Sequence, residues 1–150
     1  MKKITFILII IQLLCLSLFY YSCAKNSLDN ATNEELIGIW QLDSVKYKQD
    51  NIVKEFPDTL GKMILVELTN SSIVNLTGYC NSGLATYTVN DSKMKFDNIS
   101  LTEKACPFIG GQWEGYLFEL INVPSFDLNG NKLSLLTDSE IDLFLSKHMN

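Results

Sequence analysis

Two cysteines, Cys80 and Cys106, constrain the fold of this chain more than any other feature of its sequence. They are the only cysteines outside the apolar N-terminal run and its border. In an exported chain, such a pair meets an oxidising environment in which disulfides form. We therefore predict a Cys80–Cys106 disulfide. Two buried thiols that never meet are the alternative, because a sequence does not give the distance between them.

The N-terminus has the composition of an export signal. Lys2 and Lys3 provide a positive start, and the run from Ile4 to Ser22 contains no charged residue. A basic segment followed by an apolar one is typical of a signal peptide. The run is also long enough to cross a bilayer, so a single uncleaved transmembrane anchor is an alternative, as is ordinary secretion. In each case we expect the body of the protein to leave the cytoplasm.

Cys23 follows the apolar run directly and precedes the polar residues 24–27. A small residue before a cysteine at this place, here Ser22, resembles the lipobox of bacterial lipoproteins. The resemblance implies cleavage before Cys23, a fatty-acyl anchor such as palmitate on that residue, and a lipid-anchored place in the cell envelope, at the outer membrane or facing the periplasm. We expect three regions: a signal peptide (1–22), a polar tether (23–35) and one domain (36–150).

The charge of the chain argues against one class of partner, the nucleic acids. The formal net charge is −5, and all 12 basic residues are lysines. Proteins that bind DNA or RNA use a basic surface, which an acidic chain does not provide. Arginine, whose planar fork captures phosphates and carboxylates, is absent from the sequence.

Beyond the tether, most of the chain alternates apolar and polar residues with the period of half-buried β-strands. The strongest turn signal is Asn129-Gly130, because a type I′ hairpin turn needs positive φ at both central residues. Residues 46–61 are polar and contain Pro57, which indicates a long loop. About eight short strands are expected, in runs 36–45, 63–69, 73–78, 84–89, 93–97, 125–128, 132–135 and 141–145. Such strands predict a mostly antiparallel sheet curled toward a sandwich or partial barrel.

One segment has the period of a helix instead. Its apolar residues are spaced as in an amphipathic helix: Trp113, Tyr116, Leu117, Leu120 and Ile121. Gly110-Gly111 precedes this segment and Pro124 ends it. We therefore predict an α+β fold, in which one amphipathic helix packs on the curved sheet.

This order of motifs resembles the META domain, which is found in heat-inducible envelope lipoproteins of bacteria. The resemblance covers residues 36–147 and lacks the family's customary arginines. It is carried by Gly78, Cys80, Asn81, Gly83 and Tyr87 in the first motif, Thr102, Ala105, Cys106 and Pro107 in the second, Glu114, Leu117 and Leu120 in the helix, and Leu133 and Leu135 in the last hairpin. It implies a small curved β-sheet with one helix, an envelope location and no established catalysis.

The sequence offers no arrangement of residues typical of an active site or a metal centre. A nucleophilic Cys80 or serine would need a neighbouring base, and the only histidine, His148, is two residues from the end of the chain. Two sulfurs without a nearby histidine fall short of the four ligands of a structural zinc ion. We therefore expect no enzyme activity, no cofactor and no metal.

Two functions without catalysis fit these observations. In the first, the domain of an envelope lipoprotein binds another envelope protein or supports stress tolerance. In the second, a lipocalin-like domain binds a small apolar ligand, and Trp40, Trp113 and Tyr116 line the pocket. The alternative role of these three residues is packing in the core.

Overall fold

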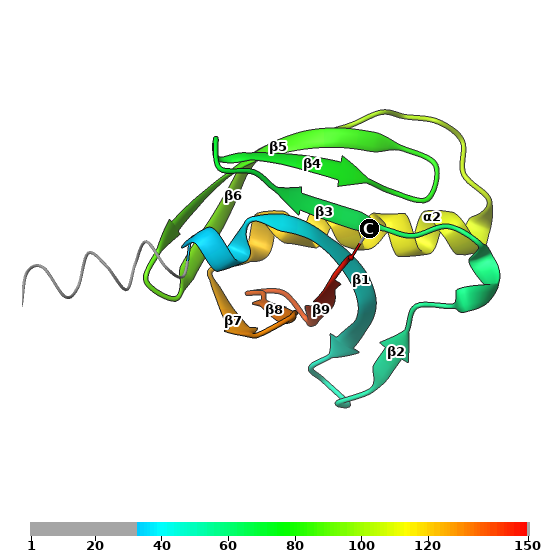
Figure 1. Cartoon of the computed structure of the whole chain (residues 1–150). Helices are drawn as coiled ribbons and strands as arrows, with labels where there is room; N and C mark the ends of the chain where they lie inside the picture. Colours follow the sequence, from blue (N-terminus) through cyan, green and yellow to red (C-terminus); the bar gives the residue numbers. More distant parts are fainter. Residues whose placement is uncertain (1–32, 150) are drawn as a thin grey trace, which may run out of the picture. The chain divides into compact units, whose positions relative to one another are not determined.

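The computed structural model describes residues 33–149 of the chain (Figure 1). The expected signal peptide, Cys23 and most of the expected tether lie outside these residues. Residues 33–36 are helical, and Glu35–Asn150 is a compact unit of its own. In the part of the chain that is described, no helix has both the length and the apolar character needed to cross a membrane.

Within residues 33–149, nine strands form one sheet in which every neighbouring pair is antiparallel. The strands are β1 (Gly38–Tyr47), β2 (Val53–Glu55), β3 (Leu65–Leu68), β4 (Ile73–Thr77), β5 (Ser82–Asn90), β6 (Lys93–Leu101), β7 (Ser125–Asn129), β8 (Lys132–Leu136) and β9 (Ile141–Lys147). This confirms the predicted, mostly antiparallel architecture.

Strand β1 closes the sheet into a ring-like partial barrel. One of its edges pairs with β9, while β3 and β2 pair with successive parts of the strand. The ring is weakest between β6 and β7, where Lys93 and Ser125 form the pairing. Figure 1 shows the helical segment lying along the ring.

Strand β2 lies in the segment that was expected to be a loop. Asn51 adopts a left-handed conformation (φ 60°), and the N–H of Tyr47 donates to the carbonyl of Ile52 at 2.9 Å. This tight turn leads the chain back along β1. Since β2 has only three residues, its alternation is too short to be recognised in the sequence. A short 3₁₀ helix, η1 (Asp58–Leu60), follows it.

The predicted hairpin joins β7 to β8, but its turn is shifted by one residue. Asn129 pairs with Lys132, so the two central residues are Gly130 and Asn131. Gly130 has a positive φ of 57°. Glycine at the first central position is the preference of a type II′ turn, whereas the sequence suggested type I′.

The helical segment consists of α2 (Phe108–Gly115) and a 3₁₀ continuation, η2 (Tyr116–Asn122). A single helical element was expected, but it begins earlier than predicted and contains Gly110-Gly111. Glycine is a poor helix former, so the sequence favoured a later start. A Cβ atom on Gly110 would lie 2.1 Å from the ring of Tyr79, so close packing explains this glycine.

Because η2 has 3₁₀ geometry, one residue of the predicted apolar face, Ile121, does not face the core. Leu117 and Leu120 are buried as expected, whereas Ile121 is 65% exposed. A 3₁₀ helix has three residues per turn, so residues three apart share one side. Leu117 and Leu120 therefore share the inner side, and Phe118 and Ile121 share the outer side.

The inward-facing side chains of the sheet pack against the helical segment in one hydrophobic core. Trp40 and Trp113 are its largest members, and both are almost completely buried. The indole N–H of Trp40 donates to the carbonyl of Leu36 at 2.7 Å. The ring of Trp113 packs edge-on against Phe56 and Tyr116, with centroids 5.0 Å and 5.3 Å away.

Candidate functional site

The predicted disulfide between Cys80 and Cys106 is present, with 5.8 Å between the two Cα atoms. Cys80 belongs to the tight connection between β4 and β5, and we call residues 78–83 the disulfide loop. Cys106 lies two residues before α2 begins. The bond therefore links the sheet covalently to the start of the helix.

Glu114 links the same loop to the other end of α2. Its Oε2 atom accepts the backbone N–H of Cys80 at 2.6 Å and that of Asn81 at 2.8 Å. Its Oε1 atom accepts a further hydrogen bond from the side-chain amide of Asn81. The side chain is only 7% exposed, so these donors replace the water that a carboxylate would otherwise bind.

The environment of Glu114 favours its charged form. Burial raises the pKa of the carboxyl group, but hydrogen bonds from the Asn81 side chain and from the N–H groups of Cys80 and Asn81 lower it, as does the charge of Lys62. The pKa therefore lies below its ordinary value. A carboxyl group that serves as a general acid near neutral pH needs a raised pKa, so the lowered pKa of Glu114 does not suit that role.

Asn81 holds together the two sides of the disulfide loop. Its Oδ1 atom accepts the backbone N–H of Lys104 at 2.6 Å and the hydroxyl of Thr102 at 2.9 Å. Its backbone carbonyl accepts the N–H of Gly78 at 2.7 Å. Because Asn81 also contacts Glu114, the loop, the segment after β6 and the helix share one hydrogen-bond network.

Two glycines of the loop allow this close approach. A Cβ atom on Gly78 would lie 2.5 Å from Oε2 of Glu114, and one on Gly83 would lie 1.9 Å from the backbone oxygen of Ser100. Both distances are shorter than non-bonded atoms tolerate. The motif that the sequence singled out is therefore a packing motif around a buried carboxylate.

Cys80, Cys106 and Glu114 each have a potential metal-ligating atom within 4.8 Å of the others. Cysteine binds metals as a thiolate, and a disulfide has none. The carboxylate of Glu114 already accepts three hydrogen bonds. In the disulfide form, these three side chains therefore do not fit a metal ion.

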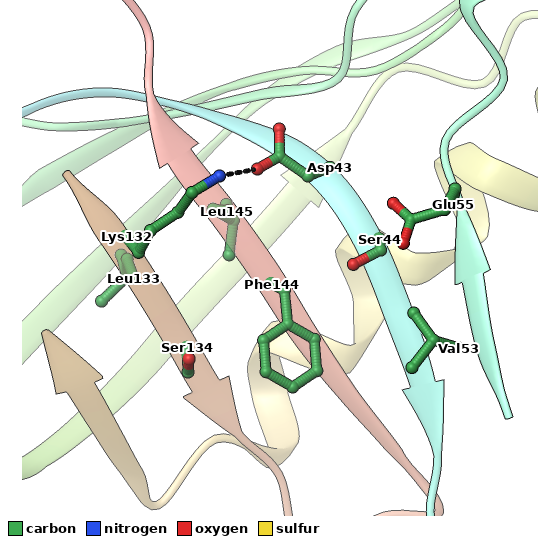
Figure 2. Close-up of a pocket in the computed structure, with 9 residues that line it drawn as sticks. All are labelled: Asp43, Ser44, Val53, Glu55, Lys132, Leu133, Ser134, Phe144 and Leu145. Carbon is green, nitrogen blue, oxygen red and sulfur yellow. Dashed lines mark hydrogen bonds and ion pairs between the residues drawn. The ribbon is translucent and has the colours of Figure 1, made fainter. Parts of the chain in front are cut away.

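A groove on the outer side of the sheet is a second candidate site (Figure 2). Its volume is about 370 Å³. Its lining comes from β1, β2, β8 and β9: Asp43, Ser44, Val53, Glu55, Lys132, Leu133, Ser134, Phe144 and Leu145. We call this site the outer groove.

The register of the strands explains the hollow. Phe144 on β9 pairs with Ser44 on β1 and with Ser134 on β8, so small side chains flank a half-buried aromatic ring. A β-bulge between Leu42 and Ser44 inserts Asp43 as an additional residue, and both Asp43 and Ser44 line the groove. The result is an apolar floor with small polar walls.

An ion pair closes one end of the outer groove. Nζ of Lys132 lies 3.0 Å from Oδ2 of Asp43, as Figure 2 shows. The hydroxyl of Ser146 donates to the other oxygen of Asp43 at 2.9 Å. Sequence reasoning missed this site, because outward residues of alternating strands read as an ordinary solvent-exposed face.

The structure brings one group of predicted site residues together around Glu114 and buries a second group in the hydrophobic core. Gly78, Asn81 and Gly83 lie with Cys80 and Cys106 around Glu114. Three other residues were weighed as pocket or core, and they are buried members of the hydrophobic core: Trp40, Trp113 and Tyr116. Cys23, the predicted lipidation site, lies outside the described residues.

Comparison with known proteins agrees with this fold. The sequence model of the META domain family matches residues 34–149. The fold is similar to an NMR structure of a protein from Burkholderia xenovorans, with a TM-score of 0.66 and 24% identity over 80% of this chain and 88% of that one. It is also similar to the crystal structure of a DUF4847 family protein from Bacteroides vulgatus ATCC 8482, with a TM-score of 0.54 and 11% identity over 75% and 94% of the two chains. At these identities the likeness shows the fold alone. No curated protein matches the chain.

Proposed function

Since the chain belongs to the META domain family, we propose that it is a non-enzymatic, lipid-anchored protein of the bacterial cell envelope whose domain binds another envelope protein. The outer groove carries this proposal. It is a concave surface on strands β1, β8 and β9 of the closed sheet, which pair on both sides, and its remaining wall is the edge strand β2, which pairs with β1. Binding sites of this kind are commonly largely pre-formed.

The chemistry of the disulfide loop supports a role without turnover. Cys80 and Cys106 are joined to each other, so neither is a free nucleophile in this form. Glu114 is buried, and its lowered pKa suits a hydrogen-bond acceptor better than an acid catalyst. The residues that the family resemblance singles out therefore stabilise the domain.

The lining of the outer groove indicates the kind of partner segment that fits it. The exposed part of Phe144 would contact an apolar side chain, with Ser44 and Ser134 offering hydroxyl groups beside it. Glu55 stands on the wall formed by β2, where a lysine or arginine of the partner would complement it. We therefore expect an extended protein segment with an apolar residue next to a basic one.

The lipocalin-like alternative is not supported by the positions of its key residues. It requires Trp40, Trp113 and Tyr116 to line a ligand cavity. Trp113 instead packs edge-on against Tyr116, and all three residues belong to the core cluster. The outer groove is the better candidate for binding.

Site-specific photo-crosslinking in living cells tests the protein-binding role. A photoreactive amino acid at Ser134, within the outer groove, is expected to give a discrete adduct with one envelope protein. The same group at Leu84, an exposed residue of β5 that does not line the groove, is the matched control. Phe144→Ala should weaken the Ser134 adduct. An absence of adducts at Ser134, both in ordinary growth and under heat stress, would refute the proposal.

Metabolic labelling with a fatty-acid analogue tests the anchor separately. The wild-type protein should carry the label and Cys23→Ala should lose it. Absence of label from both proteins would remove the lipoprotein interpretation and leave the transmembrane or secreted alternatives. This result is independent of the crosslinking result.

A further inference from the structure

The outward side of α2 and η2 carries large apolar side chains that are more than half exposed. Phe108 is 87% exposed, Ile109 56%, Phe118 56% and Ile121 65%. We call these four residues the apolar helix face. Apolar residues exposed singly are normal, but several on one helical element mark an interaction surface.

This face also lacks charge. Between Phe108 and Asn122 the only charged residues are Glu114 and Glu119. Glu114 is buried beneath the disulfide loop, and Glu119 accepts hydrogen bonds from the hydroxyl of Ser139 at 2.6 Å and from the side-chain amide of Asn122 at 3.2 Å. The fully exposed positions of the helical segment are therefore apolar or neutral, and the half-buried Glu119 is its one partly accessible charged residue.

We propose that the apolar helix face docks on the surface of the lipid bilayer that anchors the chain. This inference rests on the membrane anchoring in the proposed function. A helical surface whose fully exposed positions carry Phe and Ile and no charged residue suits the boundary between lipid headgroups and acyl chains. The outer groove, on strands β1, β2, β8 and β9, would then remain the site for the protein partner.

The length of the tether makes this docking feasible. Ten residues, 23–32, separate the apolar run from the helical residues 33–36, and a fully flexible chain of ten residues would span roughly 17 Å root-mean-square. A domain of this size has a radius of gyration of about 13 Å. The bilayer therefore stays within reach of the helical segment, and a weak interaction suffices because the tether keeps its effective concentration high.

Lys54 supplies a complementary charge beside the apolar helix face. Its Nζ atom lies 3.0 Å from the side-chain oxygen of Gln112 on α2 and 5.2 Å from the ring of Trp113. A lysine at the edge of an apolar surface can pair with lipid phosphates while the apolar side chains enter the headgroup boundary. This arrangement favours a bilayer over a purely apolar protein partner.

The test uses the full-length, anchored protein in vesicles made with brominated phosphatidylcholine, which quenches tryptophan fluorescence. Phe118→Trp adds a fluorophore on the apolar helix face, and its signal is taken as the difference from wild type because Trp40 and Trp113 are buried. We expect brominated lipid to quench about half of the added emission, since the ring would lie ~5–10 Å into the interface. Leu84→Trp, at a position with 55% exposure on β5, should be quenched little and is the matched control.

A second pair of variants tests whether the face acts as a unit. Phe108→Trp should also be quenched, and combining it with Phe118→Asp should abolish that quenching. The Phe118→Trp variant in vesicles can also be exposed to a quencher that is dissolved in the water. If this aqueous quencher has full access to the introduced tryptophan, the docking is overturned. Quenching of that tryptophan that appears only after other envelope proteins are added would also overturn it, because the face would then bind protein.

Flotation of the same vesicles separates this inference from the proposed function on which it rests. A chain that does not float with the vesicles refutes the anchor. A Phe118→Trp chain that floats while brominated lipid leaves its added emission unquenched refutes only the docking.

Discussion

Glu114 Oε2 accepts a hydrogen bond of 2.6 Å from the backbone N–H of Cys80. Cys80 is therefore linked to helix α2 twice, by this hydrogen bond and by its disulfide to Cys106. The disulfide reaches the start of α2 through Cys106, whereas Glu114 lies one residue before the end of that helix. The helix is therefore connected to the sheet at both ends. The two connections have different chemistry, so they can be removed independently.

We predict that Glu114→Gln destabilises the domain. The glutamine has one acceptor oxygen, so its NH₂ group must face N–H donors of Cys80 or Asn81 that the carboxylate now satisfies. Leaving buried donors without an acceptor should lower the free energy of unfolding by about 1–3 kcal/mol. Urea denaturation measures this change. Glu103→Gln, at an exposed position 11 residues earlier in the chain, is the control and should have little effect.

We also predict an acid-sensitive part of the stability that depends on Glu114. Its pKa is lowered in the folded state, so the folded domain binds the proton less readily than the unfolded chain. This contribution is complete above the unfolded carboxyl pKa of about 4.3 and is lost as the pH falls through the lower, folded pKa. The free energy of unfolding should therefore decrease more steeply in wild type than in Glu114→Gln as the solution is acidified. Parallel curves for the two proteins would contradict this role.

The disulfide should stabilise the domain through the unfolded state. It closes a loop with a sequence separation of 26 residues, which corresponds to about 3.5 kcal/mol in the chain-entropy model. We expect the double variant Cys80→Ala/Cys106→Ala to lose a similar amount in urea denaturation. A reducing agent should destabilise wild type and leave the double variant unchanged. An equal response of the two proteins to the reducing agent would mean that the bond does not form in solution.

The sequence was sufficient for the parts of the fold that depend on local patterns. Alternation located eight of the nine strands in the part of the chain that the structure describes, and the spacing of Trp113, Leu117 and Leu120 located the helical segment. The pair Cys80 and Cys106 could be predicted because they are the only two cysteines in the expected domain, residues 36–150. A repeating pattern of apolar residues and a pair of rare residues can both be recognised in a single sequence.

Features that depend on contacts between distant residues could not be predicted in the same way. The early start of α2 follows from the packing of Gly110 against Tyr79, and helix propensity alone argues against it. The outer groove follows from the pairing of Phe144 with Ser44 and Ser134, which lie on different strands. The buried state of Glu114 has no local signal either, because the partners of its carboxylate come from a loop more than thirty residues earlier in the chain.

Two glycines provide the last prediction, because the same substitution should have opposite effects at them. A Cβ atom on Gly83 would lie 1.9 Å from the backbone oxygen of Ser100, and backbone atoms cannot move aside cheaply. Gly83→Ala should therefore lower the free energy of unfolding by more than about 2 kcal/mol. A Cβ atom on Gly115 meets nothing within 4 Å, and this residue has helical φ and ψ of −56° and −28°. Gly115→Ala should therefore stabilise the domain by about 0.4–1 kcal/mol, because alanine restricts the unfolded chain and favours the helix. Thermal and urea denaturation of the two variants measure both effects, and destabilisation by Gly115→Ala would show that the end of α2 is packed more closely than the structure indicates.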